Sequence, residues 1–421
     1  MLVRRCAFLV LEPGTQWQLD VRQLLSGERA IEAVPGWVAR APHLLQPAVV
    51  SLAEVALLGR LPDDLWLDAE RLVDAEQRPV LEALIDKRLV MAAADAASTT
   101  AVADSAVRAQ AWFGWSAHLH AASRWQGVDS VRDDPRSAAG LTLDQLSERY
   151  GPIPTHFPQR PASDPRVALP AVAPTPLSAL LAARATCRNY RAVSVPLQDL
   201  AQVLGMVFGA HGVQPLSADC HAVKKSVPSG GALHPIEAYV LARRVDGLSS
   251  GLYHYEAGAH RLACCRALSE SEADQLALTA VAGQAWFAAA PVLLILSARF
   301  YRNFWKYRNH PKAYRVLQLD AGHLSQTLFL AAGELGYGAF ITAAINEIDL
   351  EQALGMDGME DGPLAVLGFG ARAERRETVE FDPAGRVWNA DGTPRPAAEA
   401  ANAGAQSPAH ASMLAPHVDT I

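Results

Sequence analysis

The stretch Pro228-Ser-Gly-Gly-Ala-Leu-His-Pro-Ile-Glu237 decides how the fold is interpreted, because it joins a glycine turn to the start of a strand. The two glycines permit backbone conformations that other residues avoid, and they let the main chain approach a flat ligand closely. Taken alone, the stretch is also typical of an ordinary tight turn before a strand. Its meaning therefore depends on what surrounds it.

Strands and one long helix surround this turn. The helix is predicted from an apolar stripe between Leu317 and Leu335, and Gly336 stands where a C-terminal cap belongs. Runs of strands beside long helices predict an α+β layered domain. No G-x-G-x-x-G follows a strand, so a dinucleotide-binding βαβ unit is not supported. The predicted strands are Glu237–Ala242, Gly251–Tyr255, Arg261–Cys265, Pro291–Leu296 and Pro363–Gly368.

Three side chains upstream of the turn suit an anionic group. In Arg184-Ala-Thr-Cys-Arg-Asn-Tyr190, the alternating Arg184, Thr186 and Arg188 can converge on one patch. Two guanidiniums and a hydroxyl suit a phosphate monoester, because arginine offers paired donors and a permanent charge. A solvated basic helix end would show the same pattern. Arg372 follows a strand and can supply a further phosphate contact.

A lysine and a tyrosine stand side by side at Lys306 and Tyr307, upstream of Asp320 and His323. On a protein surface such a pair is unremarkable. Buried near a ligand, each group can lower the pKa of the other or share a proton with it, so that the pair acts as acid or base near neutral pH.

The order of four segments adds a resemblance. The segments are Arg184 to Tyr190, Pro228 to Glu237, Asp320-Ala-Gly-His323 before Leu335-Gly-Tyr-Gly338, and Gly368-Phe-Gly-Ala-Arg372. Together they resemble the nitroreductase-like flavoproteins and, within those, the SagB-type dehydrogenases of peptide maturation. The resemblance covers residues 176–376 and implies a nitroreductase-like α+β domain with an antiparallel-centred sheet flanked by helices.

The resemblance also implies a cofactor, FMN, and a role for each matching residue. The phosphate contacts would be Arg184, Thr186, Arg188 and Arg372. The residues against the flavin ring would be Pro228, Ser229, Gly230, Ala232 and His234, and those lining its face near N5 would be Ile341, Thr342 and Ala343. Family members are homodimers with the flavin at the subunit interface. The chain departs from the family pattern at His234, where many relatives carry tyrosine, which leaves the acid/base groups open.

In azoline-oxidising members of this family an adjacent Lys-Tyr pair is catalytic, and Lys306 and Tyr307 occupy that place. The implied reaction converts a thiazoline or oxazoline of a precursor peptide into an azole, with a hydride passing to flavin N5 and a proton to a base. One alternative is a reductase of the same fold, which acts on a nitro, quinone or dehydroamino-acid substrate with an external hydride donor. Another is a non-catalytic peptide-binding partner.

The rest of the chain divides by composition into three further regions. Residues 1–105 mix strands and helices; a helical stripe at Val80–Ile85 after Pro79, followed by an apolar strand at Leu89–Met91, is typical of winged-helix modules. Such a module could recognise a peptide by adding it as a strand, or it could simply pad a dimer. Residues 106–175 combine a helical segment with a proline-rich linker, and residues 377–421 are expected to be largely disordered.

Composition limits the classes of function. The 421 residues include 37 Lys+Arg and 44 Asp+Glu, a net charge of −7, which disfavours nucleic-acid binding, including a DNA-binding regulator. The five cysteines form no C-x-x-C pair, so neither a metal site nor a disulfide framework follows. The longest apolar run, 285–296, is shorter than the ~20 residues of a membrane span. We therefore expect a soluble, cytoplasmic enzyme whose partners are a precursor peptide and other peptide-modifying enzymes, with no membrane partner.

Overall fold

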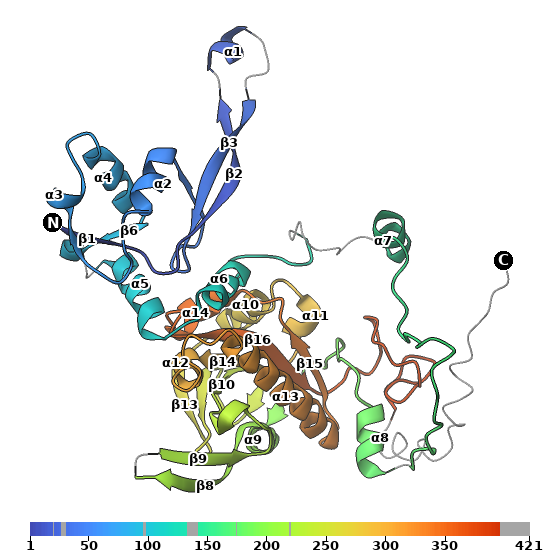
Figure 1. The fold of residues 1–421 in the computed structure, drawn as a ribbon. Helices are drawn as coiled ribbons and strands as arrows, with labels where there is room; N and C mark the ends of the chain where they lie inside the picture. Colours follow the sequence, from blue (N-terminus) through green and yellow to red (C-terminus); the bar gives the residue numbers. More distant parts are fainter. Residues whose placement is uncertain are drawn as a thin grey trace.

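The computed structural model describes residues 1–395 except 20, 27–30, 96–97, 133–141, 174 and 219. Figure 1 shows a small N-terminal region at one side, joined through two helices to a larger domain built on one sheet. We call residues 176–371 the sheet domain. No helix in the described ranges is long and apolar enough to cross a bilayer.

The sheet domain is built on six strands in the order β13-β12-β10-β14-β16-β15, and every neighbouring pair is antiparallel. The predicted antiparallel-centred α+β fold and its five predicted strands are confirmed. The strands are β10 (Ile236–Ala242), β12 (Gly251–Glu256), β13 (Arg261–Ala267), β14 (Val292–Arg299), β15 (Gly338–Thr342) and β16 (Asp361–Gly370).

The central strand β14 is buried at every residue except Arg299, because helices cover both faces of the sheet. Its alternate side chains divide between two cores: Leu294 packs toward α9 and α13, whereas Leu293 packs toward α10, α11 and α14. The predicted long helix is α13, and Gly336 follows it with a φ of +79°. The helices are α9 (Leu197–Phe208), α10 (Glu270–Ala280), α11 (Ala285–Ala288), α13 (Ala313–Glu334) and α14 (Glu347–Leu354).

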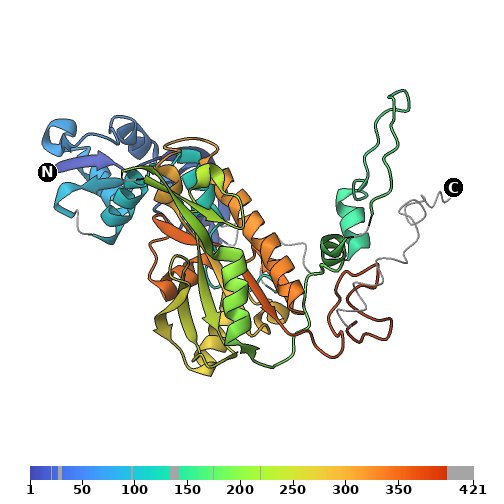
Figure 2. The same cartoon turned by 90° about the horizontal axis from the view of Figure 1, so that it is seen from below.

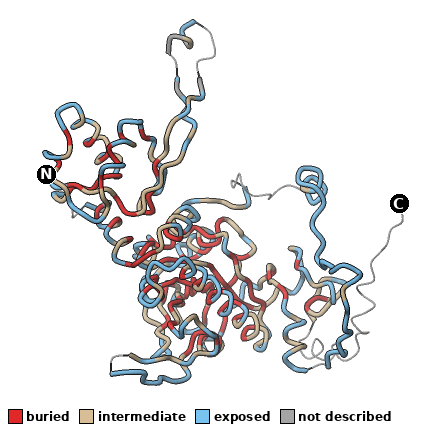
Figure 3. Tube along the Cα trace, viewed as in Figure 1, coloured by how far each residue is buried: buried red, intermediate tan, exposed pale blue. Residues whose placement is uncertain are grey.

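Several short elements complete the sheet domain. The hairpin β8–β9 projects from one end of the domain and is mostly exposed (Figure 3). These elements are α8 (Pro176–Ala182), β7 (Val195–Pro196), β8 (Ala210–Ser217), β9 (Cys220–Lys225), the 3-10 turn η2 (Gly230–Ala232), β11 (Val245–Asp246) and α12 (Phe300–Phe304).

The N-terminal region is a smaller α+β unit with its own core. It holds two three-stranded sheets, β2-β3-β4 and β5-β1-β6, and the β2–β3 hairpin projects away from the rest of the chain (Figure 1). The elements are β1 (Leu2–Arg5), β2 (Val10–Leu19), α1 (Val21–Ser26), β3 (Ile31–Arg40), β4 (Ala48–Val50), α2 (Leu52–Leu58), β5 (Leu67–Asp68), α3 (Ala69–Leu72), α4 (Arg78–Asp86), β6 (Val90–Ala92) and the 3-10 turn η1 (Ala93–Asp95). The predicted helix after Pro79 and the strand behind it are confirmed as α4 and β6; the winged-helix interpretation stays a prediction.

Residues 99–132 fasten the two parts together. They form α5 (Thr99–Ala109) and α6 (Gly114–Ser123), and Trp112 between them is fully buried in the core of the sheet domain. Its indole Nε1 donates to the Met359 carbonyl at 2.9 Å. His120 is also buried and bonds Tyr314 Oη and the Gly358 carbonyl, and burial lowers the pKa of its imidazole to about 3. A buried neutral histidine and an indole thus anchor this stretch.

Two irregular segments lie on the side of the molecule where α8 and the C-terminal part of the chain are drawn (Figure 1). The short helix α7 (Leu143–Tyr150) precedes residues 151–173, which contain no helix or strand and stand away from the sheet (Figure 2). Residues 372–395 turn back after β16, with Glu380 and Trp388 buried. The expectation of a largely disordered extension over residues 377–421 stays a prediction; residues 377–395 are described, and residues 396–421 lie outside the described part.

Candidate functional site

The glycine turn adopts the unusual backbone that its sequence predicts. Gly231 has a φ of +64°, and Ala232 and His234 also lie at positive φ, a conformation that costs energy for residues with a side chain. A Cβ at Gly230 would collide with Val316 of α13, so only glycine lets the turn pack this closely against the helix. Such clustered strain is typical of functional sites.

Asp320 of α13 fixes this turn. Its buried carboxylate accepts a hydrogen bond from Ser229 Oγ at 2.5 Å and one from the Gly230 N–H at 3.3 Å. Ser229 Oγ in turn accepts from the His234 N–H at 2.9 Å. Charge-assisted bonds of this kind are stronger than neutral ones, so Asp320 holds both ends of the turn in one conformation.

Lys306 and Tyr307 meet at the same glycine. Lys306 Nζ and Tyr307 Oη each lie 2.9 Å from the point that a Gly231 Cβ would occupy. Lys306 is exposed and Tyr307 is half-buried, and both follow the short helix α12. Arg302 of that helix donates from Nε to the Leu233 carbonyl at 2.9 Å, which ties α12 to the turn. A lysine amino group and a tyrosine hydroxyl thus lie beside the fixed backbone of the turn.

His234 points away from this pair. Its Nε2 lies 3.0 Å from the Val223 carbonyl of β9 and must donate to it, because a carbonyl only accepts. Burial and the nearby Lys225 lower the pKa of the imidazole, which favours the neutral ring with its proton on Nε2. His234 therefore links the turn to the β8–β9 hairpin.

A cavity of about 650 Å³ opens beside Lys306. It is lined by residues of the β8–β9 hairpin, by the glycine turn, and by Tyr301 and Trp305. Trp305 is 57% exposed, which is unusual for a large aromatic side chain in a folded domain. The cavity is large enough for a ligand with several rings or for a short peptide segment.

The three residues predicted to line the flavin face lie at the end of β15. Ile341 is half-buried and packs against the α13-side core, Thr342 is buried and Ala343 is exposed. The Thr342 hydroxyl accepts from Gln284 Nε2 and from the Ala344 N–H, both at 3.1 Å. The Thr342 hydroxyl oxygen is thus an acceptor for two bonds within the chain, whereas the neighbouring Ala343 is exposed.

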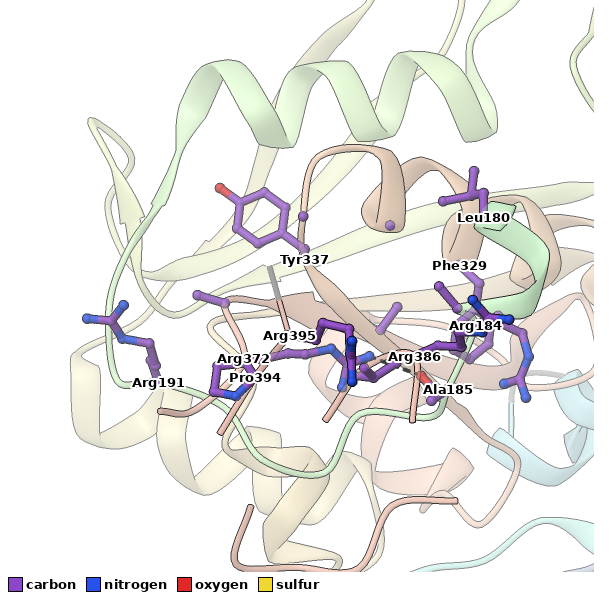
Figure 4. A pocket seen from close by; sticks show the side chains of 16 residues that line it. Leu180, Arg184, Ala185, Arg191, Phe329, Tyr337, Arg372, Arg386, Pro394 and Arg395 are labelled. Carbon is purple, nitrogen blue, oxygen red and sulfur yellow. Dashed lines mark hydrogen bonds between the residues drawn. The ribbon is translucent and has the colours of Figure 1, made fainter. Parts of the chain in front are cut away.

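A second cavity, of about 360 Å³, lies at the C-terminal end of α13 and is lined by five arginines (Figure 4). Arg184 and Arg372, two of the four predicted phosphate contacts, are among them. The Arg184 guanidinium rests over the Phe329 ring at 5.3 Å. The other three are Arg191, Arg386 and Arg395.

The other two predicted phosphate contacts, Thr186 and Arg188, are not among the residues that line this cavity. Thr186 bridges Ala339 of β15 in parallel, so the segment extends the sheet edge. Arg188 lies two residues after Thr186 in the chain. Its guanidinium lies over the ring of Phe287 in α11, 5.6 Å from the ring centroid. The structure therefore brings Arg184 and Arg372 together and leaves the Arg188 side chain on the opposite face of the sheet.

The helix α13 connects the two sites. Asp320 holds the glycine turn near one end, and Phe329 lines the arginine cavity near the other, which at about 1.5 Å per residue places them about 14 Å apart along the helix axis. A ligand that joins a flat ring system to a phosphate through a short linker would match this arrangement of a backbone cradle and a cationic cavity.

Comparison with known proteins identifies the sheet domain. The Nitroreductase family model matches residues 181–371. A Methanocaldococcus jannaschii protein named as a nitroreductase is 30% identical over 208 residues, which make up 49% of this chain and 97% of that protein. The chain belongs to the nitroreductase family. Membership indicates a flavin oxidoreductase, and residues 181–371 are its nitroreductase domain.

Two further relatives of this nitroreductase act in peptide maturation. The trifolitoxin-processing protein TfxB of Rhizobium leguminosarum is 26% identical over 250 residues, covering 58% of this chain and 66% of TfxB. The microcin B17-processing protein McbC of Escherichia coli is 27% identical over 167 residues, covering 37% and 57%. One chain of the solved E. coli microcin synthetase McbBCD complex with truncated pro-MccB17 matches with a TM-score of 0.45 and 18% identity, covering 60% of this chain and 90% of the matched one.

The residues of this nitroreductase fit a flavin. The glycine cradle suits a flat ring system, and the guanidiniums of the second cavity suit a phosphate. Sequence reasoning did not assign Asp320, although it lies in a quoted motif and on the apolar stripe of α13. It also did not assign Glu380, Arg386 and Arg395, which follow the nitroreductase domain in a stretch without periodic pattern.

Proposed function

We propose that this member of the nitroreductase family is an FMN-dependent dehydrogenase that oxidises azolines to azoles in a ribosomally synthesised peptide. The observation that carries the proposal is the convergence of Lys306 Nζ and Tyr307 Oη on Gly231, inside the turn that the family resemblance places against the flavin ring. The relation to TfxB and McbC, which process trifolitoxin and microcin B17, supports a peptide substrate.

The proposed chemistry removes two hydrogens from one carbon–carbon bond of the azoline ring. When bound, FMN supplies an acceptor for the hydride and its electron pair at N5. Lys306 as the neutral amine, or Tyr307 as the phenolate, takes the remaining proton, because both groups lie beside Gly231 and Lys306 also lines the larger cavity. Asp320 and Ser229 keep the cradle fixed so that the ring and the proton acceptor stay aligned.

The site variants Lys306→Ala and Tyr307→Phe test the assignment. We expect both to retain FMN while turnover of a candidate precursor peptide falls by at least about a hundredfold, because a positioned acid or base contributes that much. The measurement is mass spectrometry of the peptide, which should lose two mass units per ring with the unaltered enzyme. Normal rates in both variants would remove Lys306 and Tyr307 from the mechanism.

The identity with the M. jannaschii protein named as a nitroreductase favours a second candidate, a reductase that takes hydride from an external donor. Mixing the yellow protein with NADPH in the absence of peptide separates the two. Rapid bleaching of the flavin absorbance supports the reductase. Absence of bleaching, together with peptide-dependent turnover and oxygen uptake, supports the dehydrogenase.

We also propose that the N-terminal region recognises the precursor peptide. β2 pairs only with β3, so one long edge of its sheet is unpaired in the described part of the chain, and Trp17 on that strand is 72% exposed. A peptide strand added there would satisfy the free backbone groups. Hydrogen exchange of residues 10–19 with and without precursor peptide tests this, and unchanged protection would contradict it.

A homodimer with the flavin at the subunit interface completes the proposal, and other peptide-modifying enzymes would be its partners. Light scattering of the flavin-loaded protein measures the oligomeric state, and a mass of twice that of one chain is expected.

A third possibility, a non-catalytic peptide-binding partner, is excluded if the Lys306→Ala variant binds peptide normally and loses turnover.

A further inference from the structure

The arginine cavity has a wall that the nitroreductase domain does not supply. Arg184, Arg191 and Arg372 belong to or adjoin the domain, but Arg386 and Arg395 come from the segment that follows it. We call residues 376–395 the C-terminal strap. Figure 4 shows Arg184, Arg372, Arg386 and Arg395 among the side chains that line this cavity.

The cavity carries unbalanced positive charge. Arg372 pairs with Glu380 at 2.7 Å and Arg191 with Glu374 at 3.3 Å. Within the described ranges, no carboxylate pairs with the guanidiniums of Arg184, Arg386 and Arg395. The Nε atoms of Arg386 and Arg395 are buried and have no hydrogen-bond partner. Buried donors without partners cost free energy, so the cavity is built for an acceptor.

A buried carboxylate holds the strap in place. Glu380 is fully buried and accepts from the backbone N–H groups of Arg188 and Asn189 at 2.6 and 3.1 Å, and from Asn189 Nδ2 at 2.9 Å. Its other oxygen accepts from Arg372 Nη1 at 2.7 Å and from Trp388 Nε1 at 2.8 Å. Glu380 therefore fixes the strap to the segment that contains Arg188 and orients Arg372 toward the cavity.

We infer that the C-terminal strap is part of the phosphate-binding site: Arg386 and Arg395 join Arg184 and Arg372 in binding the phosphate monoester of the flavin, and Glu380 positions the strap. The inference rests on the proposed FMN-dependent function. A phosphate monoester matches the cavity because it presents several acceptor oxygens and close to two negative charges, which planar guanidiniums bind in pairs.

Riboflavin provides the test, because it carries the same ring system as FMN without the phosphate. The dissociation constants of the full-length apoprotein for FMN and riboflavin are measured by quenching of flavin fluorescence. We expect Arg386→Gln and Arg395→Gln each to weaken FMN binding by roughly tenfold and to leave riboflavin binding unchanged. The matched control is Arg375→Gln, which removes the same charge from an exposed position outside the cavity.

The outcomes separate the inference from the proposed function. Unaltered FMN affinity in the Arg386→Gln and Arg395→Gln variants would overturn the inference, and so would equal losses for FMN and riboflavin, which would show a structural effect. Neither result would affect the proposed function. An unaltered protein that binds neither flavin would overturn the proposed function, and the inference with it.

Discussion

The site near Asp320 and the cavity near Phe329, toward the two ends of α13, are built from different kinds of residues. Near Asp320 the site is made by shape, since glycines without side chains and a fixed turn place Lys306 and Tyr307 against one point. Near Phe329 it is made by charge, since arginines from separate segments surround one cavity. The difference predicts separate failures: changes at the first end should reduce turnover, and changes at the second should reduce flavin affinity.

The largest effect is expected at the first end, for Gly231→Ala. The new Cβ would lie 2.9 Å from both Lys306 Nζ and Tyr307 Oη, and the positive φ adds strain. Because both groups are displaced together, turnover should fall on the order of 10³-fold while FMN affinity changes little. Steady-state kinetics and flavin titration of the same variant measure the two quantities.

Gly258→Ala is the control for this change, because a Cβ there meets no atom within 4 Å. It should leave both turnover and flavin affinity unchanged. The comparison between the two ends fails if Gly231→Ala loses flavin and turnover in parallel.

The next effect concerns the second end. Glu380→Gln removes the charge of a fully buried carboxylate and leaves Arg372 without its counter-charge. Breaking such a pair should lower the free energy of unfolding by about 3 kcal/mol, and FMN affinity should fall with it. Denaturant unfolding gives the first value. Turnover of the flavin-saturated enzyme should persist, in contrast to Gly231→Ala.

Glu374→Gln is the matched control, since Glu374 pairs with Arg191 on the surface and is 79% exposed. Exposed pairs contribute below about 1 kcal/mol, so this variant should unfold almost as the unaltered protein does. Equal destabilisation by the two changes would mean that the burial of Glu380 does not increase the contribution of its ion pair to the free energy of unfolding.

The smallest effect is expected at Glu347, away from both ends of α13. It tests whether turnover and flavin affinity are independent of the stability of the fold. Burial raises the pKa of Glu347 from 4.5 to about 7, although its carboxyl accepts from the Trp125 N–H. The protonated form favours the folded state, so this contribution is complete below about pH 4.5 and is lost as the pH rises through 7. Glu347→Gln should reduce the loss of stability between pH 5 and pH 8 by on the order of 1–2 kcal/mol. It should change neither turnover nor flavin affinity.

Thermal unfolding between pH 5 and pH 8 measures this loss, with the exposed Glu334→Gln as control. An identical pH dependence in the unaltered protein and the Glu347→Gln variant would show that Glu347 titrates normally in the folded chain.

The sequence predicted the parts of the fold that depend on local pattern. The apolar run of β14, the stripe of α13 and the turn at Gly230 and Gly231 all follow from residue type and spacing. The roles of Arg184 and Arg372 stay predictions, although the structure places both side chains at one cavity. Periodicity and short motifs are sufficient where the residues that decide a structure lie close together in the sequence.

The sequence could not predict what depends on contacts between distant segments. Glu380 is an ordinary glutamate in a stretch without periodicity, and its role arises from donors almost 200 positions earlier in the chain. The direction of the Arg188 guanidinium depends on the position of Phe287, and that of His234 on the carbonyl of Val223. Tertiary packing, rather than local propensity, decides these positions.

Because Trp112 is buried in the core of the sheet domain, the domain needs more residues to fold than the family model matches. The indole lies outside the matched residues 181–371, yet it packs at 4.6 Å from the ring of Phe300 and 4.7 Å from that of Phe304. Excising the nitroreductase domain at its family limits would leave a cavity of indole size and two bare aromatic rings, a loss of about 3–5 kcal/mol by analogy with deletion of a buried tryptophan side chain. The smallest fragment that folds by itself should therefore begin before residue 112, and the N-terminal region and the nitroreductase domain should melt in one transition.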